Sequence, residues 1–144
     1  MSKRSNLAGY RAALIVGDSE LVARIREVRK HAGMMVPLPI QRALTVALKD
    51  EKHVQAQSLI YANRRNKLKP ALEQAGFKVE FSEAGLYIWC TRGENAWDSV
   101  TWLSELGILV APGSFYGPAG EKNIRVALTA SDAKINEAAE RILA

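Results

Sequence analysis

The residues of this sequence that could do chemistry are a lysine, a serine, two histidines and a cysteine. Lys3 lies in "SKRSNLAGYR", and from spacing alone a lysine so near a terminus is an ordinary hydrated charge. Ser114 lies in "PGSFYG" and lacks the GxSxG context of a hydrolase nucleophile. His31 and His53 are 22 residues apart, with no further ligand at metal-site spacing. These residues alone predict neither a hydrolase triad nor a metal site.

The composition is that of a globular protein of one or two units. The chain has 144 residues, of which 48% are hydrophobic and 24% charged, enough to build a hydrophobic core. Its apolar runs fall far below the roughly 20 residues of a membrane-spanning helix, and no export signal is visible. Cys90 is the single cysteine, which excludes an internal disulfide. We expect a cytoplasmic protein without a membrane partner.

The net charge of +5 raises nucleic acid as a partner. The densest basic cluster is "NRRNKLK", over residues 63–69. This cluster alternates with apolar positions at helical spacing, so a solvated helix face explains it better. No nucleic-acid partner is therefore expected.

Before residue 42 the apolar pattern predicts a strand, a helix and a connector. "RAALIVGD" indicates a short buried strand over residues 12–16, and Asp18 can cap the following helix by accepting from free backbone amides. That helix ends at Gly33. Pro37 and Pro39 then make residues 34–41 a stiff connector, where the chain is expected to change domain.

After the connector the pattern predicts helices that cover a small sheet. Two amphipathic helices come first, and Pro70 lies inside the second, so a kink or restart is expected near Lys69. "FKVEF" and "GLYIWCT" indicate a hairpin, a helix follows, then strands at "ILVAPG" and "NIRVAL", and Ser131 caps a last helix. The fold class is α/β, with an α+β small domain whose largely antiparallel sheet is covered by helices.

The segment "SKRSNLAGYR" resembles the lysine segment of the class I/II aminotransferases, which are fold-type I enzymes that use pyridoxal 5'-phosphate. In that family a lysine amine condenses with the cofactor aldehyde, and an arginine eight residues later, after a glycine-aromatic pair, grips the cofactor phosphate. Lys3 and Arg11 have that spacing, with Gly9 and Tyr10 before the arginine. The resemblance implies that Lys3 is the catalytic, cofactor-binding lysine and that Arg11 binds the phosphate through its fork of donors.

Further motifs extend the resemblance over nearly all of the chain. "EAGLYIW" is similar to the family's glycine-aromatic strand, and "APGSFYG" to its PGxxFG loop at the active-site entrance. "NIRVAL" resembles the strand whose arginine clamps the substrate α-carboxylate, which implies that role for Arg125. The lysine segment and "HAGMMVPLPIQ" together look most like succinyldiaminopimelate aminotransferases of lysine biosynthesis. Related members act on aspartate or aromatic amino acids or are carbon-sulfur lyases, and these remain alternatives.

The resemblance also predicts the organisation of the protein. Residues 1–35 correspond to a remnant of the large cofactor-binding domain, and residues 36–144 to the small C-terminal domain. In the family an aspartate before the lysine keeps the pyridine nitrogen protonated, and none of the four aspartates here matches that motif. The neighbours of the strand at residues 12–16 also precede the lysine in the family, so we expect this strand to pair with another copy, to detach or to repack on the small domain.

We therefore expect the C-terminal portion of a longer parent, inactive by itself. The complete parent would be a homodimer that binds amino-acid and keto-acid substrates. The alternative is a noncatalytic binding module derived from this domain.

Overall fold

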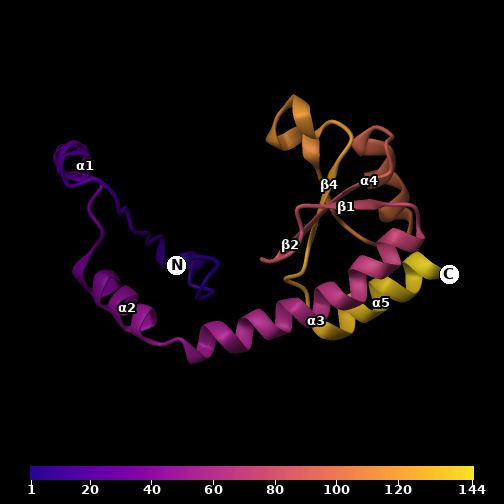
Figure 1. Cartoon of the computed structure of the whole chain (residues 1–144), viewed down its shortest axis with the longest axis horizontal. Helices are drawn as coiled ribbons and strands as arrows, with labels where there is room; N and C mark the ends of the chain where they lie inside the picture. The colour runs from indigo at the N-terminus through magenta and orange to yellow at the C-terminus, as the bar shows by residue number, and fades with distance from the viewer. The chain divides into compact units, whose positions relative to one another are not determined.

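A computed structural model describes residues 1–144 (Figure 1), which divide into two units, Met1–Ala56 and Gln57–Ala144. The first unit holds the 3-10 helix η1 (Ala8–Tyr10), α1 (Ser19–His31), α2 (Leu38–Lys49) and the start of α3 (Lys52–Gln74). The second unit holds the rest of α3, then β1 (Lys78–Glu80), β2 (Tyr87–Thr91), α4 (Ala96–Glu105), β3 (Ala111–Pro112), η2 (Gly113–Tyr116), η3 (Pro118–Gly120), β4 (Ile124–Ala127) and α5 (Asp132–Leu143). The division expected between residues 35 and 36 concerns the domains of the parent and stays a prediction.

The sheet of the second unit has the strand order β1-β2-β4-β3, and each neighbouring pair is antiparallel. "FKVEF" and "GLYIWCT" form the predicted hairpin, in which Val79 is the register partner of Cys90. β4 then pairs with β2 on one side and with β3 on the other. The α+β small domain with an antiparallel sheet is confirmed.

Helices α3, α4 and α5 cover one face of this sheet. Side chains that alternate along β2 and β4 point to the covered face, and each helix adds buried residues at helical spacing. The members of this core that are least exposed are Leu68, Leu72, Ile88, Cys90, Leu103, Ile124 and Leu128. Burying each large aliphatic side chain contributes about 1.5–3 kcal/mol. Burial also raises the pKa of the Cys90 thiol to about 12, so the neutral thiol persists throughout the neutral range.

The helix caps expected from the sequence are present. The Asp18 carboxylate accepts a hydrogen bond from the Leu21 amide at 2.9 Å and begins α1. The Ser131 hydroxyl accepts from the Lys134 amide at 3.4 Å and begins α5. Each cap satisfies an amide that has no partner within its helix.

Residues 12–16 do not form the strand that their apolar pattern predicts. Ala12 is buried, but Leu14, Ile15 and Val16 are 56%, 53% and 88% exposed. A strand is stable only when a neighbour accepts and donates its backbone hydrogen bonds. No strand of the sheet includes this segment, so the prediction of a buried strand is wrong.

Two further elements differ from expectation. α3 runs without interruption through Pro70, so it does not restart near Lys69, while a kink there stays a prediction. Proline costs about 3 kcal/mol inside a helix, but burial of Leu68 and Leu72 on either side offsets that cost. In "ILVAPG" only Ala111–Pro112 pairs with β4, so this strand is shorter than predicted.

None of the helices combines the length and apolar character that crossing a bilayer requires.

Candidate functional site

The lysine segment forms a closed loop in the first unit. The Met1 amine donates a hydrogen bond to the Ala12 carbonyl at 3.4 Å, and η1 lies within the loop. Lys3 is near one end of this loop and Arg11 is next to the other end. The structure therefore brings both predicted cofactor-binding residues into one loop.

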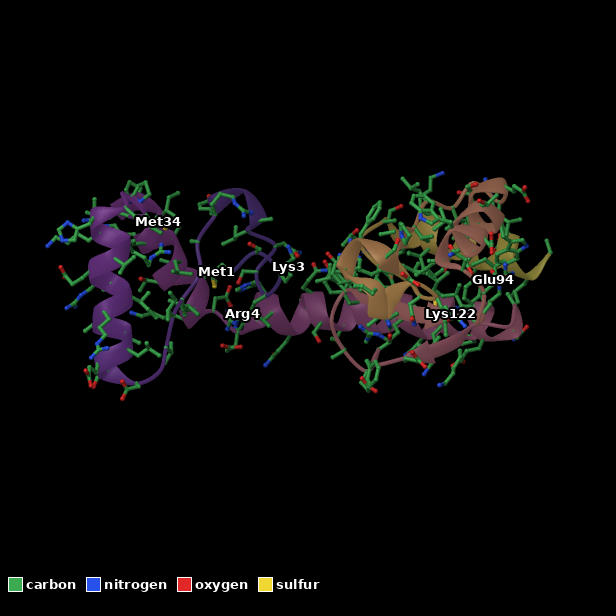
Figure 2. All side chains as sticks on the ribbon, turned by 90° about the horizontal axis from the view of Figure 1, so that it is seen from above. Met1, Lys3, Arg4, Met34, Glu94 and Lys122 are labelled. Carbon is green, nitrogen blue, oxygen red and sulfur yellow. The ribbon has the colours of Figure 1, made fainter.

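Lys3 and its neighbour Arg4, both labelled in Figure 2, differ sharply in their contacts. Arg4 forms an ion pair with Glu51 and donates from Nη1 to the Ala47 carbonyl at 3.0 Å, which ties the loop to the end of α2 and to the segment after it. The Lys3 side chain is exposed, and its amine makes no hydrogen bond or ion pair. An amine without a structural partner is available for a ligand.

Arg11 has a left-handed backbone, with φ 50° and ψ 38°, and follows directly after η1. Its amide and its Nη1 both donate to the Ala8 carbonyl, at 3.3 and 3.1 Å. Asn6, in the same loop, also has a positive φ, of 51°. Such conformations are uncommon outside glycine and often occur at functional sites. The contact with Ala8 orients the guanidinium and leaves most of its donors free for an anion.

Arg125 lies in the second unit, on the face of the sheet opposite the core. Directly opposed residues of antiparallel strands share a face, and Arg125 has Trp89 of β2 and Ala111 of β3 as its register partners. Its Cζ is 4.1 Å from the ring centroid of Tyr87 and 5.0 Å from that of Tyr116. The guanidinium is therefore held by aromatic faces from β2 and from η2.

A close approach between two glycines shapes the loop that carries Tyr116. A Cβ built on Gly113 would lie 2.3 Å from the Gly120 carbonyl oxygen and 2.8 Å from the Trp89 ring. The Gly113 amide donates to the Asn123 carbonyl at 2.7 Å, which fixes the loop against β4. The Trp89 and Tyr116 rings then meet edge to face at 6.0 Å. Only glycine fits where the chain at residue 113 passes so close to Gly120. The first glycine of "PGSFYG" therefore determines where Tyr116 lies.

Arg125 lacks a hydrogen-bond acceptor, unlike the other arginines that are at least partly buried. Those arginines each donate to a carboxylate or a backbone carbonyl, and they are Arg4, Arg29, Arg64, Arg65 and Arg92. Arg125 has only its two rings, and its Nε is buried without a partner. Leaving a charged donor without an acceptor is costly, so this guanidinium is suited to a ligand carboxylate.

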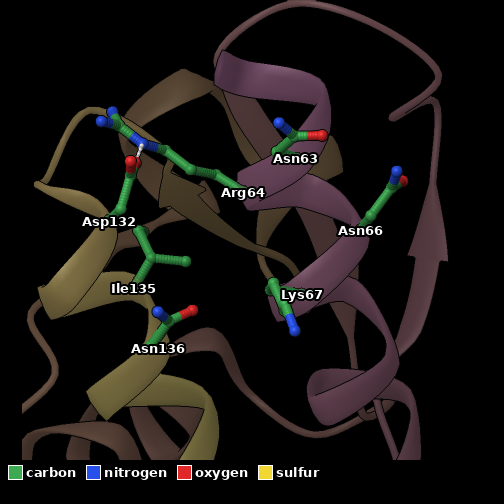
Figure 3. A pocket seen from close by; sticks show the side chains of 7 residues that line it. All are labelled: Asn63, Arg64, Asn66, Lys67, Asp132, Ile135 and Asn136. Carbon is green, nitrogen blue, oxygen red and sulfur yellow. Dashed lines mark hydrogen bonds and ion pairs between the residues drawn. The ribbon is translucent and has the colours of Figure 1, made fainter. Parts of the chain in front are cut away.

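A separate pocket of about 430 Å³ lies between α3 and α5 (Figure 3). None of Lys3, Arg11 and Arg125 lines it. The charge of Arg64 is already used there, because its Nε donates to Asp132 at 2.6 Å and its Nη1 to the Leu128 carbonyl at 3.0 Å. The pocket is lined by Asn63, Arg64, Asn66, Lys67, Asp132, Ile135 and Asn136.

Sequence reasoning missed the two tyrosines that hold Arg125. Both tyrosines lie inside motifs that the sequence analysis quotes, since Tyr87 is in "GLYIW" and Tyr116 in "GSFYG". Their contact with Arg125 depends on strand register and on the glycine crossing, which no local pattern encodes. Lys3 and Arg11 belong to the first unit and Arg125 to the second.

The sequence model of the family described as aminotransferase class I and II matches residues 1–142. The chain belongs to the class I and II aminotransferases. Proteins of this family depend on pyridoxal 5'-phosphate. The free amine of Lys3 and the spare donors of Arg11 fit the aldehyde and the phosphate of that cofactor.

Two curated aminotransferases are 56% identical to this chain over 142 residues. They are "Probable aminotransferase Rv1178" of Mycobacterium tuberculosis and the 4-dedimethylamino-4-oxo-anhydrotetracycline transaminase OxyQ of Streptomyces rimosus. Each alignment covers 99% of this chain but only 34% and 40% of the two relatives. A solved structure, titled "probable N-succinyldiaminopimelate aminotransferase" of Thermus thermophilus, has a TM-score of 0.87 at 29% identity, covering 99% of this chain and 39% of its own. The chain thus spans between a third and two fifths of these aminotransferases.

Proposed function

We propose that this chain is the C-terminal portion of an aminotransferase that moves an amino group between an amino acid and a keto acid. The observation that carries this proposal is Arg125, a partly buried guanidinium without an acceptor, held between two rings on the open face of the sheet. An α-carboxylate is the group common to amino acids and keto acids. A planar guanidinium can donate two parallel hydrogen bonds to it.

Lys3 and Arg11 would hold the cofactor in the complete protein. The Arg11 guanidinium, already oriented by the Ala8 carbonyl, would donate to the phosphate. Bound there, pyridoxal phosphate supplies an electron sink for the pair left on the substrate Cα. The Lys3 amine would first hold the cofactor and then, once the substrate amine has displaced it, would accept the proton from the substrate Cα and deliver it to the cofactor's aldehyde carbon. The exposure and lack of partners of Lys3 support this role.

We propose N-succinyldiaminopimelate as the amino-group substrate of the complete protein. The lysine segment and connector support this substrate, as does the structural likeness to the Thermus thermophilus protein. A second candidate is a polycyclic ketone, which the 56% identity to OxyQ favours. A homodimeric state and a cytoplasmic location of the complete protein stay predictions.

The test uses the complete protein with added pyridoxal phosphate. Glutamate is supplied together with the keto form of N-succinyldiaminopimelate, and 2-oxoglutarate formation is measured. A parallel assay replaces this keto acid with an anhydrotetracycline-type ketone. Borohydride reduction and peptide mass analysis then locate the cofactor. We expect turnover, cofactor on Lys3, and loss of both in Lys3→Ala. Cofactor on another lysine would refute the site, and binding without turnover of any amino acid would favour the noncatalytic module.

A further inference from the structure

We infer that Tyr87 and Tyr116 are positioning residues that orient Arg125, so that a carboxylate approaches the terminal edge of its guanidinium. The identity of that carboxylate rests on the proposed function. The orientation does not, because it is set by contacts within this chain. Neither tyrosine was singled out by the sequence for any role.

The two rings contact the guanidinium from different elements. Tyr87 is the register partner of Ala127, which places it diagonally beside Arg125 on the same face, while Tyr116 comes from η2. Both ring centroids, at 4.1 and 5.0 Å from Cζ, are within the roughly 6 Å over which a ring attracts a cation. A side chain that otherwise samples many rotamers is thereby restricted before any ligand arrives.

Burial of Nε selects the edge that remains for a ligand. A guanidinium can form a bidentate pair through Nε and Nη2 or through its two Nη groups. The Nε of Arg125 is buried and has no acceptor in the structure. A carboxylate is therefore received on the Nη1 and Nη2 edge.

The rings act through their faces. Neither tyrosine hydroxyl makes a hydrogen bond, while the Tyr116 ring also packs against the Trp89 ring. Phenylalanine keeps the ring face and leucine removes it. This contrast separates cation binding by the ring from any effect of the hydroxyl.

The first experiment measures the arginine side chain in the 144-residue chain by ¹⁵N NMR. In Tyr87→Leu and in Tyr116→Leu we expect the Arg125 Nε–H to exchange with solvent at least about tenfold faster. In Tyr87→Phe and Tyr116→Phe the rate should stay within about twofold of the original. Phe115→Leu is the matched control, since its ring is in the same loop but pairs with Trp97. Unchanged exchange in the leucine variants, or equal acceleration in Phe115→Leu, would overturn the inference.

Acetate added at constant ionic strength then tests which edge of the Arg125 guanidinium receives a carboxylate. We expect it to shift the Arg125 Nη signals more than the Nε signal, and a larger Nε shift would overturn end-on binding.

In the complete protein, Tyr116→Leu should raise KM for the amino acid about threefold to tenfold while kcat changes less. In Tyr116→Phe the KM should stay near that of the unsubstituted protein. An unchanged KM in Tyr116→Leu would overturn the positioning role. Absence of all turnover in the unsubstituted complete protein would instead refute the proposed function, while the NMR result would still stand.

Discussion

At the scale of single residues, the partners of each charged group distinguish structural roles from candidate functional ones. Arg4 and Arg64 have carboxylate and carbonyl partners that hold parts of the chain together. Lys3 has none, and Arg125 has only aromatic faces. Because an unpaired buried donor is costly, the Arg125 guanidinium is suited to a ligand that supplies the missing acceptor.

Replacing Arg125 by lysine in the complete protein keeps the charge but removes the fork of donors. Losing one charge-assisted hydrogen bond of roughly 1.5–3 kcal/mol should lower kcat/KM about tenfold to a hundredfold for every amino-acid substrate. Cofactor retention should be unchanged, whereas Arg11→Lys should release cofactor. Half-reaction rates and cofactor absorbance measure both effects. Cofactor release by Arg125→Lys with intact substrate affinity would show that its role is misassigned.

Glu94 offers a prediction about pH. The Ser99 hydroxyl donates to its carboxylate at 2.6 Å and the Arg92 guanidinium lies beside it, which together lower the pKa of Glu94 from its usual 4.5. A lowered pKa adds stability that is present above pH 4.5 and is lost as the pH falls through the folded value.

Ser99→Ala should therefore raise the pKa of Glu94 and reduce the stability lost on acidification. Carboxyl ¹³C NMR titration measures the pKa directly. Ser104→Ala is the control, because Ser104 is on the same helix but donates to the Thr101 carbonyl. A pKa of Glu94 that stays low in Ser99→Ala would show that Arg92 alone sets it.

At the scale of elements, antiparallel register and a glycine crossing together build the face around Arg125. Strand β4 places Arg125 opposite Trp89, and the loop after β3 returns over that ring because Gly113 and Gly120 approach each other closely. The loop then reaches Arg125 through Tyr116. The Arg125 guanidinium is thus in contact with one ring from β2 and one from η2.

Gly113→Ala should therefore displace this loop and destabilise the second unit. The added Cβ would meet two backbone oxygens, at 2.3 and 2.6 Å, and overpacking of this kind costs about 1–3 kcal/mol. The free energy of unfolding can be followed in urea by tryptophan fluorescence, since Trp89, Trp97 and Trp102 are all in this unit. Gly17→Ala is the control, because nothing lies within 4 Å of its Cβ. Equal stability of the two variants would contradict the prediction.

At the scale of the whole molecule, the two units differ in how much they bury. The second unit has a continuous core of aliphatic and aromatic side chains. In the first unit Ala12 is the only buried residue, and neither α1 nor α2 buries any side chain. Helices of 13 and 12 residues without a packed face are marginal in water.

Amide hydrogen exchange of the 144-residue chain should reflect this difference. We expect amides of α1 and α2 to be protected by less than about a hundredfold, and those of β2 and β4 by more than about a thousandfold. Mass spectrometry after peptic digestion resolves the two units. Similar protection in α1 and β2 of the monomeric chain would contradict the prediction.

The 144-residue chain by itself should not turn over amino acids, even with added cofactor. The ring nitrogen of pyridoxal phosphate needs an acidic partner. Each aspartate of this chain either has a partner already or lies in the first turn of a helix. Asp18 caps α1, Asp50 pairs with His53, Asp132 pairs with Arg64, and Asp98 lies in the first turn of α4. Steady-state assays of the chain beside the complete protein provide the measurement. Turnover by the chain with cofactor on Lys3 would disprove this expectation.

The sequence by itself determined most of the helices, their caps, the hairpin and the family. These features depend on local periodicity and on motifs such as "SKRSNLAGYR", which short segments carry. The apolar pattern of residues 12–16 predicts a strand that does not form, because a strand needs a neighbour. α3 continues through Pro70 because buried leucines on either side offset its cost.

Only the tertiary structure decided the surroundings of Arg125. Tyr87, Tyr116 and Arg125 come from separate segments, and they meet because strand register and the Gly113–Gly120 crossing bring those segments together. Register is set by the packing of a whole sheet face on its core, so no single segment carries that information.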